Sequence, residues 1–131
     1  MRKYSLFFVI IILLIILGGC NKLITTDDLI GGKWVAKSGY KDGEAYGKPQ
    51  CPYLNDGIEF KDEETVYVKS GDKDFRYNLR KSDDGMEITF FNPSGDMDSY
   101  EVIMNNENKL VLIGFGTGVS KSFNCYFERE K

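Results

Sequence analysis

The class of fold is decided by residues 75–90, which read Phe75-Arg76-Tyr77-Asn78-Leu79-Arg80-Lys81-Ser82-Asp83-Asp84-Gly85-Met86-Glu87-Ile88-Thr89-Phe90. On each side of the turn signal Ser82-Asp83-Asp84-Gly85, apolar side chains alternate with polar ones. A period of two places the apolar side chains on one face of an extended strand, whereas a helix repeats every 3.6 residues. The stretch therefore predicts two antiparallel strands joined by a tight turn.

The same alternation recurs along most of the chain. It marks strands at Gly32–Lys37, Ile58/Phe60, Val66/Val68, Phe75/Tyr77/Leu79, Ile88/Phe90, Tyr100/Val102/Met104, Leu110–Phe115 and Phe123/Cys125/Phe127. Short turn signals such as Gly116-Thr117-Gly118 separate these strands, and the one long connection is Gly39–Leu54. Tight connections pair each strand with its sequence neighbour, because a parallel pair needs a crossover of a dozen or more residues. The sequence predicts an all-β domain, an eight-stranded antiparallel up-and-down barrel, with a β-sandwich as the alternative.

The N-terminus has the anatomy of a secretory signal. Met1-Arg2-Lys3 is basic, Leu6–Leu17 is an apolar run of twelve residues, and Leu17-Gly18-Gly19-Cys20 follows. This length suits the roughly 7 to 15 residues of a signal-peptide core and is short of the about 20 that a spanning helix needs. The order resembles the lipobox of bacterial lipoproteins, which implies cleavage before Cys20 and a diacylglycerol on its thiol. The alternatives are a short membrane anchor and an ordinary secretory signal.

These features predict three segments. We expect a lipoprotein signal peptide over residues 1–19, the lipidated Cys20 and a tether over residues 20–30, and one barrel domain over residues 31–131. The tether carries a helical signal at Thr26–Ile30, where Thr26 or Asp27 could cap a single turn. The expected location is the outer face of a bacterial cell membrane, with the lipid as the anchor.

The charge of the chain argues against nucleic acid as a partner. The whole chain has 17 basic and 20 acidic side chains and a formal net charge of -3. Because Arg2 and Lys3 lie in the expected signal peptide, the mature segment keeps 15 basic against 20 acidic side chains, a net charge of -5. An acidic domain lacks the basic surface that nucleic-acid binding needs.

The remaining cysteines form an even pair. With Cys20 acylated, Cys51 and Cys125 would lie in an oxidising compartment, where a disulfide is the default expectation. The alternative is two independent thiols, because buried free cysteines are common in apolar strands.

The domain resembles small bacterial lipocalin-like proteins of the calycin group. Gly32-Lys33-Trp34 matches the family's Gly-x-Trp opening, and Tyr126-Phe127-Glu128-Arg129 is similar to its closing strand with a terminal Arg. The likeness covers residues 30–129 and implies a barrel that binds ligands at its mouth. In an up-and-down barrel Trp34 and Arg129 lie at the same end, so Arg129 could stack on the indole. The alternative is a solvated Arg129 beside a plain core Trp34.

Catalytic signals are weak. The chain has no histidine, which excludes Ser-His-Asp and Cys-His nucleophilic systems and His-ligated metals. Carboxylate pairs such as Asp83-Asp84 fall in expected turns, and Gly114–Gly118 lacks the helix and Lys of a phosphate loop. We therefore expect no enzyme activity, no cofactor and no metal site.

Two classes of function remain. The first is a binding protein that captures a small apolar ligand or a peptide at the barrel mouth, under the loop Gly39–Leu54. Candidate ligand-binding residues are Tyr46, Tyr53, Tyr77, Phe90 and Tyr100, because aromatic rings suit such contacts and the tyrosines add a polar tip. The second is an envelope interaction or protection protein, of inhibitor or immunity type, that binds a macromolecule through its surface and loops.

Overall fold

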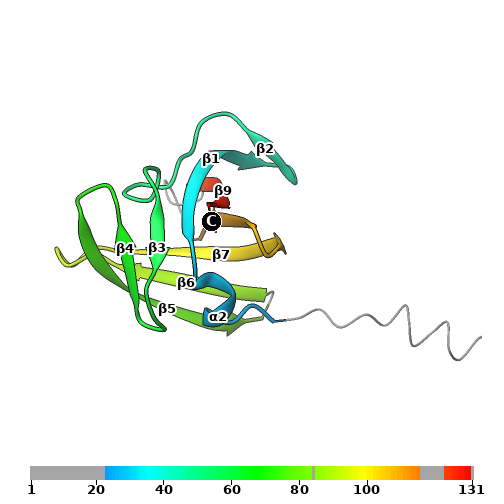
Figure 1. The fold of residues 1–131 in the computed structure, drawn as a ribbon. Helices are drawn as coiled ribbons and strands as arrows, with labels where there is room; N and C mark the ends of the chain where they lie inside the picture. The colour runs from blue at the N-terminus through cyan, green and yellow to red at the C-terminus, as the bar shows by residue number, and fades with distance from the viewer. Residues whose placement is uncertain (1–22, 84, 116–122, 131) are drawn as a thin grey trace, which may run out of the picture.

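A closed antiparallel barrel forms the described part of the chain (Figure 1). The computed structural model describes residues 23–83, 85–115 and 123–130. Their elements are α2 (Thr26–Leu29), β1 (Lys33–Lys41), β2 (Glu44–Tyr46), β3 (Ile58–Phe60), β4 (Thr65–Val68), β5 (Lys73–Ser82), β6 (Gly85–Phe91), β7 (Met97–Asn106), β8 (Lys109–Gly114) and β9 (Asn124–Glu130). Consecutive strands from β3 to β9 pair with each other, β1 pairs with β3, and β9 returns to pair with β1.

The predicted fold class is confirmed. Eight strands close the barrel, and the closing register runs from Lys33↔Glu130 to Ser38↔Tyr126 with an irregularity after Ala36. Closure removes the two exposed edges that an open sheet of this size would keep. The architecture is compatible with a lipocalin-like fold. The expected signal peptide, Cys20 and the turn Gly116–Gly118 lie outside the described residues. Within those residues, no helix has the length and hydropathy to cross a bilayer.

The expected loop Gly39–Leu54 contains a strand that the sequence pattern does not predict. β1 continues to Lys41 and forms a hairpin with β2, which lies outside the closed barrel. Asp42 and Gly43 make its two-residue turn with φ of 52° and 83°, the positive values that an Asp-Gly hairpin turn needs. β2 escapes prediction because all three of its residues are exposed, so it has no apolar face to mark it.

Side chains of the inward strand faces fill the barrel. The buried core includes Ile58, Phe60, Val66, Val68, Phe75, Tyr77, Ile88, Phe90, Tyr100, Val102, Leu110, Leu112, Cys125 and Phe127. The rings of Phe60 and Tyr77 meet edge to face at 4.9 Å between centroids, and those of Phe90 and Tyr100 at 5.8 Å. These are the separations at which tilted aromatic pairs attract one another.

One end of the barrel is closed by α2, Trp34 and Arg129. The fully buried indole of Trp34 donates from Nε1 to the carbonyl of Leu29 at 2.9 Å. The guanidinium of Arg129 lies 4.4 Å from the centre of the Trp34 ring, so the predicted stacking is confirmed. Arg129 also donates to the carbonyls of Asp28 and Ile30, which ties the last strand to the end of the helix.

Two local details complete this end. The helix is capped by Thr25 rather than by Thr26 or Asp27, because the Asp28 carboxylate accepts from the Thr25 backbone N–H at 2.9 Å. This reciprocal contact is typical of a capping box.

At Gly32, φ is +83° and an added Cβ would lie 2.7 Å from the Glu130 carbonyl. Glycine in the Gly-x-Trp opening is therefore required by the close approach of β9.

Candidate functional site

The opposite end of the barrel is covered by a disulfide-held loop. The predicted bridge between Cys51 and Cys125 is present, with the Cα atoms 5.9 Å apart and both residues fully buried. Cys125 faces inward between β8 and β1, and Cys51 and Leu54 join the same core cluster. The Cys51 N–H donates to Asn55 Oδ1 at 2.8 Å, and Gln50 N–H donates to the Asn124 carbonyl at 3.3 Å. The loop is thus drawn into the mouth as a plug.

The five predicted ligand-binding residues do not lie together. Tyr77, Phe90 and Tyr100 are buried in the filled interior, where they contact one another or Phe60. Tyr46 and Tyr53 are 65% and 45% exposed, so they lie on the surface. Tyr46 lies on the β1–β2 hairpin next to Lys41. Both residues line a hollow of about 280 Å³.

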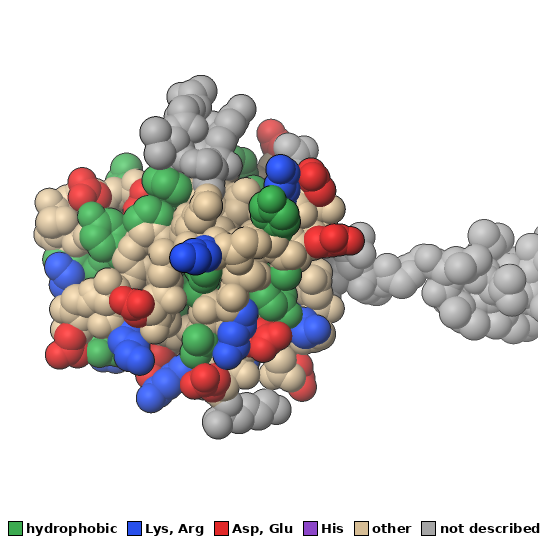
Figure 2. All heavy atoms as spheres, turned by 90° about the horizontal axis from the view of Figure 1, so that it is seen from above, with side chains coloured by type: hydrophobic (Ala, Val, Ile, Leu, Met, Phe, Trp, Pro, Cys, Tyr) green, Lys and Arg blue, Asp and Glu red, His purple; other side chains and the backbone are tan. Residues whose placement is uncertain are grey.

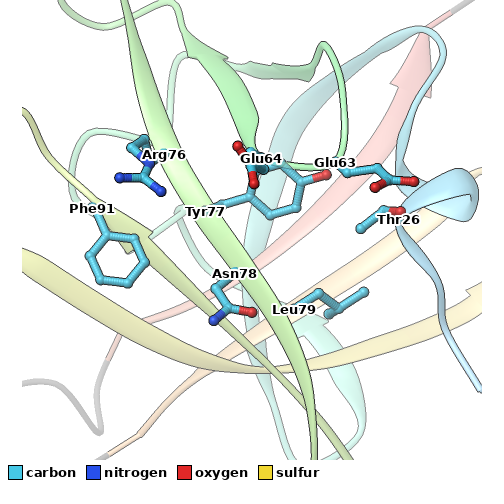
Figure 3. A pocket seen from close by; sticks show the side chains of 8 residues that line it. All are labelled: Thr26, Glu63, Glu64, Arg76, Tyr77, Asn78, Leu79 and Phe91. Carbon is cyan, nitrogen blue, oxygen red and sulfur yellow. The ribbon is translucent and has the colours of Figure 1, made fainter.

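A groove of about 520 Å³ lies on the outside of the barrel, along β5. It is lined by Thr26, Glu63, Glu64, Arg76, Tyr77, Asn78, Leu79 and Phe91. Figure 3 shows Arg76, Asn78 and Phe91 on one side of the β5 ribbon, and Glu63, Glu64 and Thr26 on the other. The groove therefore crosses the edge of a strand. The sequence pattern does not predict this groove, although its lining includes Tyr77, one of the candidate ligand-binding residues.

The groove exists because β4 and β5 differ in length. β4 pairs with β5 from Val68↔Lys73 to Thr65↔Arg76 and ends there, whereas β5 continues to Ser82. One further bond, from the Tyr77 N–H to the Glu64 carbonyl at 2.9 Å, extends the contact. Beyond this bond, the C-terminal part of β5, from Leu79 to Ser82, pairs only with β6 among the described residues. The signal was present in the sequence as a short Val66/Val68 run beside a longer run through Leu79.

Acidic side chains form one wall of the groove. Glu63 and Glu64 are exposed in the turn between β3 and β4. The nearby ion pairs join Lys61 to Asp74 at 2.9 Å and Arg80 to Glu87 at 3.0 Å, so neither involves Glu63 or Glu64. Backbone N–H groups of Glu64 and Thr65 donate to Asp62 and hold the pKa of its carboxyl below the usual range. Asp62 therefore keeps its negative charge to a lower pH than an ordinary Asp.

Tyr77 connects the groove to the core. Its hydroxyl donates to the Asp62 carbonyl at 2.6 Å. Burial first, and then the negative charges of Asp62, Glu63 and Asp27, raise the pKa of Tyr77 to about 12. The neutral hydroxyl is consequently the stable form beside this acidic turn.

We expect Tyr77→Phe to lower the free energy of unfolding by about 1 kcal/mol, the usual value of one hydrogen bond. Because the folded-state pKa of about 12 exceeds the ordinary value of 10.0, this contribution is complete below pH 10 and is lost as the pH rises toward 12. Urea unfolding at several pH values measures the loss of stability, and absorbance titration of tyrosinate measures the pKa. Loss of a titration near pH 10 in Tyr77→Phe, instead of one near pH 12, would contradict the assignment.

The described residues hold no candidate metal site, and two titratable side chains of β7 have raised pKa values. No cluster of three or more Cys, Asp or Glu side chains within them has the geometry to hold a metal ion. Asp98 points inward opposite Phe90 near the covered mouth, and burial followed by the charge of Asp96 raises the pKa of its carboxyl. Burial likewise raises the pKa of the Tyr100 hydroxyl two residues along the same strand.

No family model, no curated protein and no solved structure matches the chain. On the face shown in Figure 2, acidic and basic side chains are interspersed, and apolar side chains form small separate patches.

Proposed function

We propose that the protein is a lipid-anchored, lipocalin-like binding module that works outside the cytoplasmic membrane and binds a protein partner through its outer surface. The observation that carries this proposal is the filled barrel. Its inward side chains pack against each other, and the Cys51–Cys125 loop occupies the mouth. Capture of a small apolar ligand at the mouth would require these buried groups to separate, so the interaction or protection role is the better supported of the two classes.

The proposed anchor sets the orientation of the barrel. At about 3.5 Å per residue, the segment from Cys20 to Thr25 spans no more than about 20 Å. The barrel end that carries α2 would therefore lie near the membrane, and the disulfide-held loop and the β1–β2 hairpin would face away from it. Because the net charge is negative, attachment rests on the lipid rather than on attraction to anionic headgroups.

The lipid anchor is testable at one position. We expect Cys20→Ser to abolish lipidation, because the lipobox needs a thiol as the acyl acceptor. Growth with a radiolabelled or alkyne-bearing fatty acid should label the wild-type chain and leave the variant unlabelled. The matched control is Cys51→Ser, which removes a different thiol and should keep the label. Equal labelling of Cys20→Ser and wild type would contradict the proposed anchor.

Binding through the outer surface can be tested by photo-crosslinking in cells. A photoreactive phenylalanine analogue is placed at three exposed positions, Asn78 in the groove, Lys37 on β1 and Lys48 after β2. We expect a protein adduct of defined mass from at least one position after irradiation. If every position stayed free of adducts while a stoichiometric apolar molecule copurified with the protein, the mouth-binding alternative would replace this proposal.

A further inference from the structure

We propose that the barrel end that carries α2 rests directly on the bilayer surface, with the side chain of Leu23 immersed among the lipid headgroups. The inference rests on the proposed function, because it takes Cys20 as the lipidated residue. It adds a second contact with the membrane, made by the folded domain itself. The partner of this surface is a zwitterionic phospholipid bilayer.

The first argument is the length of chain between the anchor and the fold. Ile24 is half-buried and packs against the hydrophobic core, so the barrel holds the chain from this residue onward. Four peptide steps separate Ile24 from Cys20, and a fully extended chain of that length spans about 14 Å. The barrel end therefore stays within about this distance of the lipidated residue, and closer in every less extended conformation.

The second argument is that α2 resists unwinding, so the tether cannot lengthen at its expense. Arg129 donates to the carbonyls of Asp28 and Ile30. The carbonyl between them, that of Leu29, accepts from Trp34 Nε1 at 2.9 Å. The Leu29 side chain is also fully buried. Unwinding α2 would break these hydrogen bonds and expose Leu29 to water, both of which cost free energy.

The third argument is an apolar side chain at the point where the chain enters the fold. Figure 1 shows α2 at the end of the barrel from which the first described residues lead away. Leu23 is 52% exposed there. The other exposed large apolar side chains of the described residues belong to the opposite end: Tyr46, Tyr53, Phe91, Met97 and Phe115. Immersion in the membrane interface would remove the apolar surface of Leu23 from water.

Charge does not drive this contact. Asp27, Glu63 and Glu64 are exposed at the α2 end, and so are Lys33 and Lys109. Side chains of both signs can face the positive and negative groups of zwitterionic headgroups. An anionic bilayer would repel the chain as a whole, because its net charge is negative. The short tether and Leu23 therefore carry the inference, and a zwitterionic bilayer is the surface that they fit.

Neutron reflectometry measures the contact without a label. The lipidated protein, purified from its host, is placed in a supported phosphatidylcholine bilayer. The control combines Leu23→Ser with ten Gly and Ser residues inserted after Lys22, which add a reach of about 17 Å. We expect the wild-type protein layer to lie directly on the headgroups and the control layer to stand above a hydrated gap. A gap of equal thickness under both proteins would overturn the proposal.

Tryptophan quenching locates the contact at Leu23. Leu23→Trp and Met97→Trp place a tryptophan at opposite ends of the barrel, and wild type supplies the baseline of Trp34, the single tryptophan of the chain. Each lipidated protein is reconstituted in phosphatidylcholine vesicles with and without bromine on the acyl chains near the headgroup. We expect the fraction of added emission that bromine quenches to be at least threefold larger for Leu23→Trp. Equal quenching of the two variants would overturn the assignment of Leu23.

These measurements separate the inference from the proposed function. A hydrated gap beneath a wild-type protein that still carries its fatty acid would overturn the inference and leave the anchor and surface binding intact. Equal fatty-acid labelling of Cys20→Ser and wild type would overturn the anchor and this inference together. A stoichiometric apolar molecule in a protein layer that lies on the headgroups would overturn surface binding and support the membrane contact.

Discussion

Replacing Trp34 with alanine should lower the free energy of unfolding by about 3 to 5 kcal/mol, the range for large aromatic truncations in packed sites. Trp34 is fully buried, its Nε1 donates to the Leu29 carbonyl, and its ring supports the Arg129 guanidinium. The variant loses all three contacts and leaves a space between β1, α2 and β9. Urea unfolding followed by far-ultraviolet circular dichroism measures the change without relying on the single tryptophan.

The Arg129 contact can be separated from the loss of core volume. Arg129→Ala should cost less than Trp34→Ala, because Arg129 is only partly buried. In a double-mutant cycle, the two changes should be coupled by about 0.5 to 2 kcal/mol, the range of a cation–aromatic contact. Lys37→Ala, an exposed cation on the same β1 strand, is the control and should show no coupling. Additive effects of Trp34→Ala and Arg129→Ala would reject the stacking as a stabilising interaction.

Loss of the Cys51–Cys125 bridge should have a similarly large effect. The two cysteines are 74 residues apart in sequence, and for a loop of this length the chain-entropy relation gives about 4 kcal/mol. Cys51→Ala combined with Cys125→Ala should therefore lower the free energy of unfolding by about this amount and release the loop from the mouth. Urea unfolding of wild type with and without reductant provides the comparison. Equal stability of the oxidised and reduced protein would contradict a stabilising role.

Reduction also tests the plug. An environment-sensitive apolar dye should fluoresce weakly with the oxidised protein. Its fluorescence should rise once reduction releases the loop, because Leu54 and the inward rings then become accessible. Strong dye binding to the oxidised protein would show that the mouth is open in the bridged state.

The barrel was predictable because its signals are local. Alternating apolar residues define the strand faces, and short turns leave each strand only its neighbour to pair with. Trp34 and Arg129 were predictable as a pair because strand alternation places both at one end. The cysteine pairing followed from their number and the expected compartment. Each of these predictions follows from residue type and order along the chain, without knowledge of the distances between side chains.

The β2 strand and the groove were harder to predict for physical reasons. β2 lacks an apolar face, so only its Asp42-Gly43 turn marks the hairpin. The groove depends on where β4 stops relative to β5, and the ends of strands are set by three-dimensional packing. The same limit explains why the predicted ligand-binding residues do not form one site. Period two places Tyr77, Phe90 and Tyr100 inside but does not tell whether the interior is open or filled.

Native mass spectrometry of the full chain, gently extracted from its host membrane, tests most directly whether binding takes place outside the barrel. We expect the mass of the chain with its lipid on Cys20 and an intact Cys51–Cys125 bridge, without a bound small apolar molecule. A stoichiometric apolar molecule that is released only on denaturation would contradict this account, because it would show that the interior opens to hold a ligand.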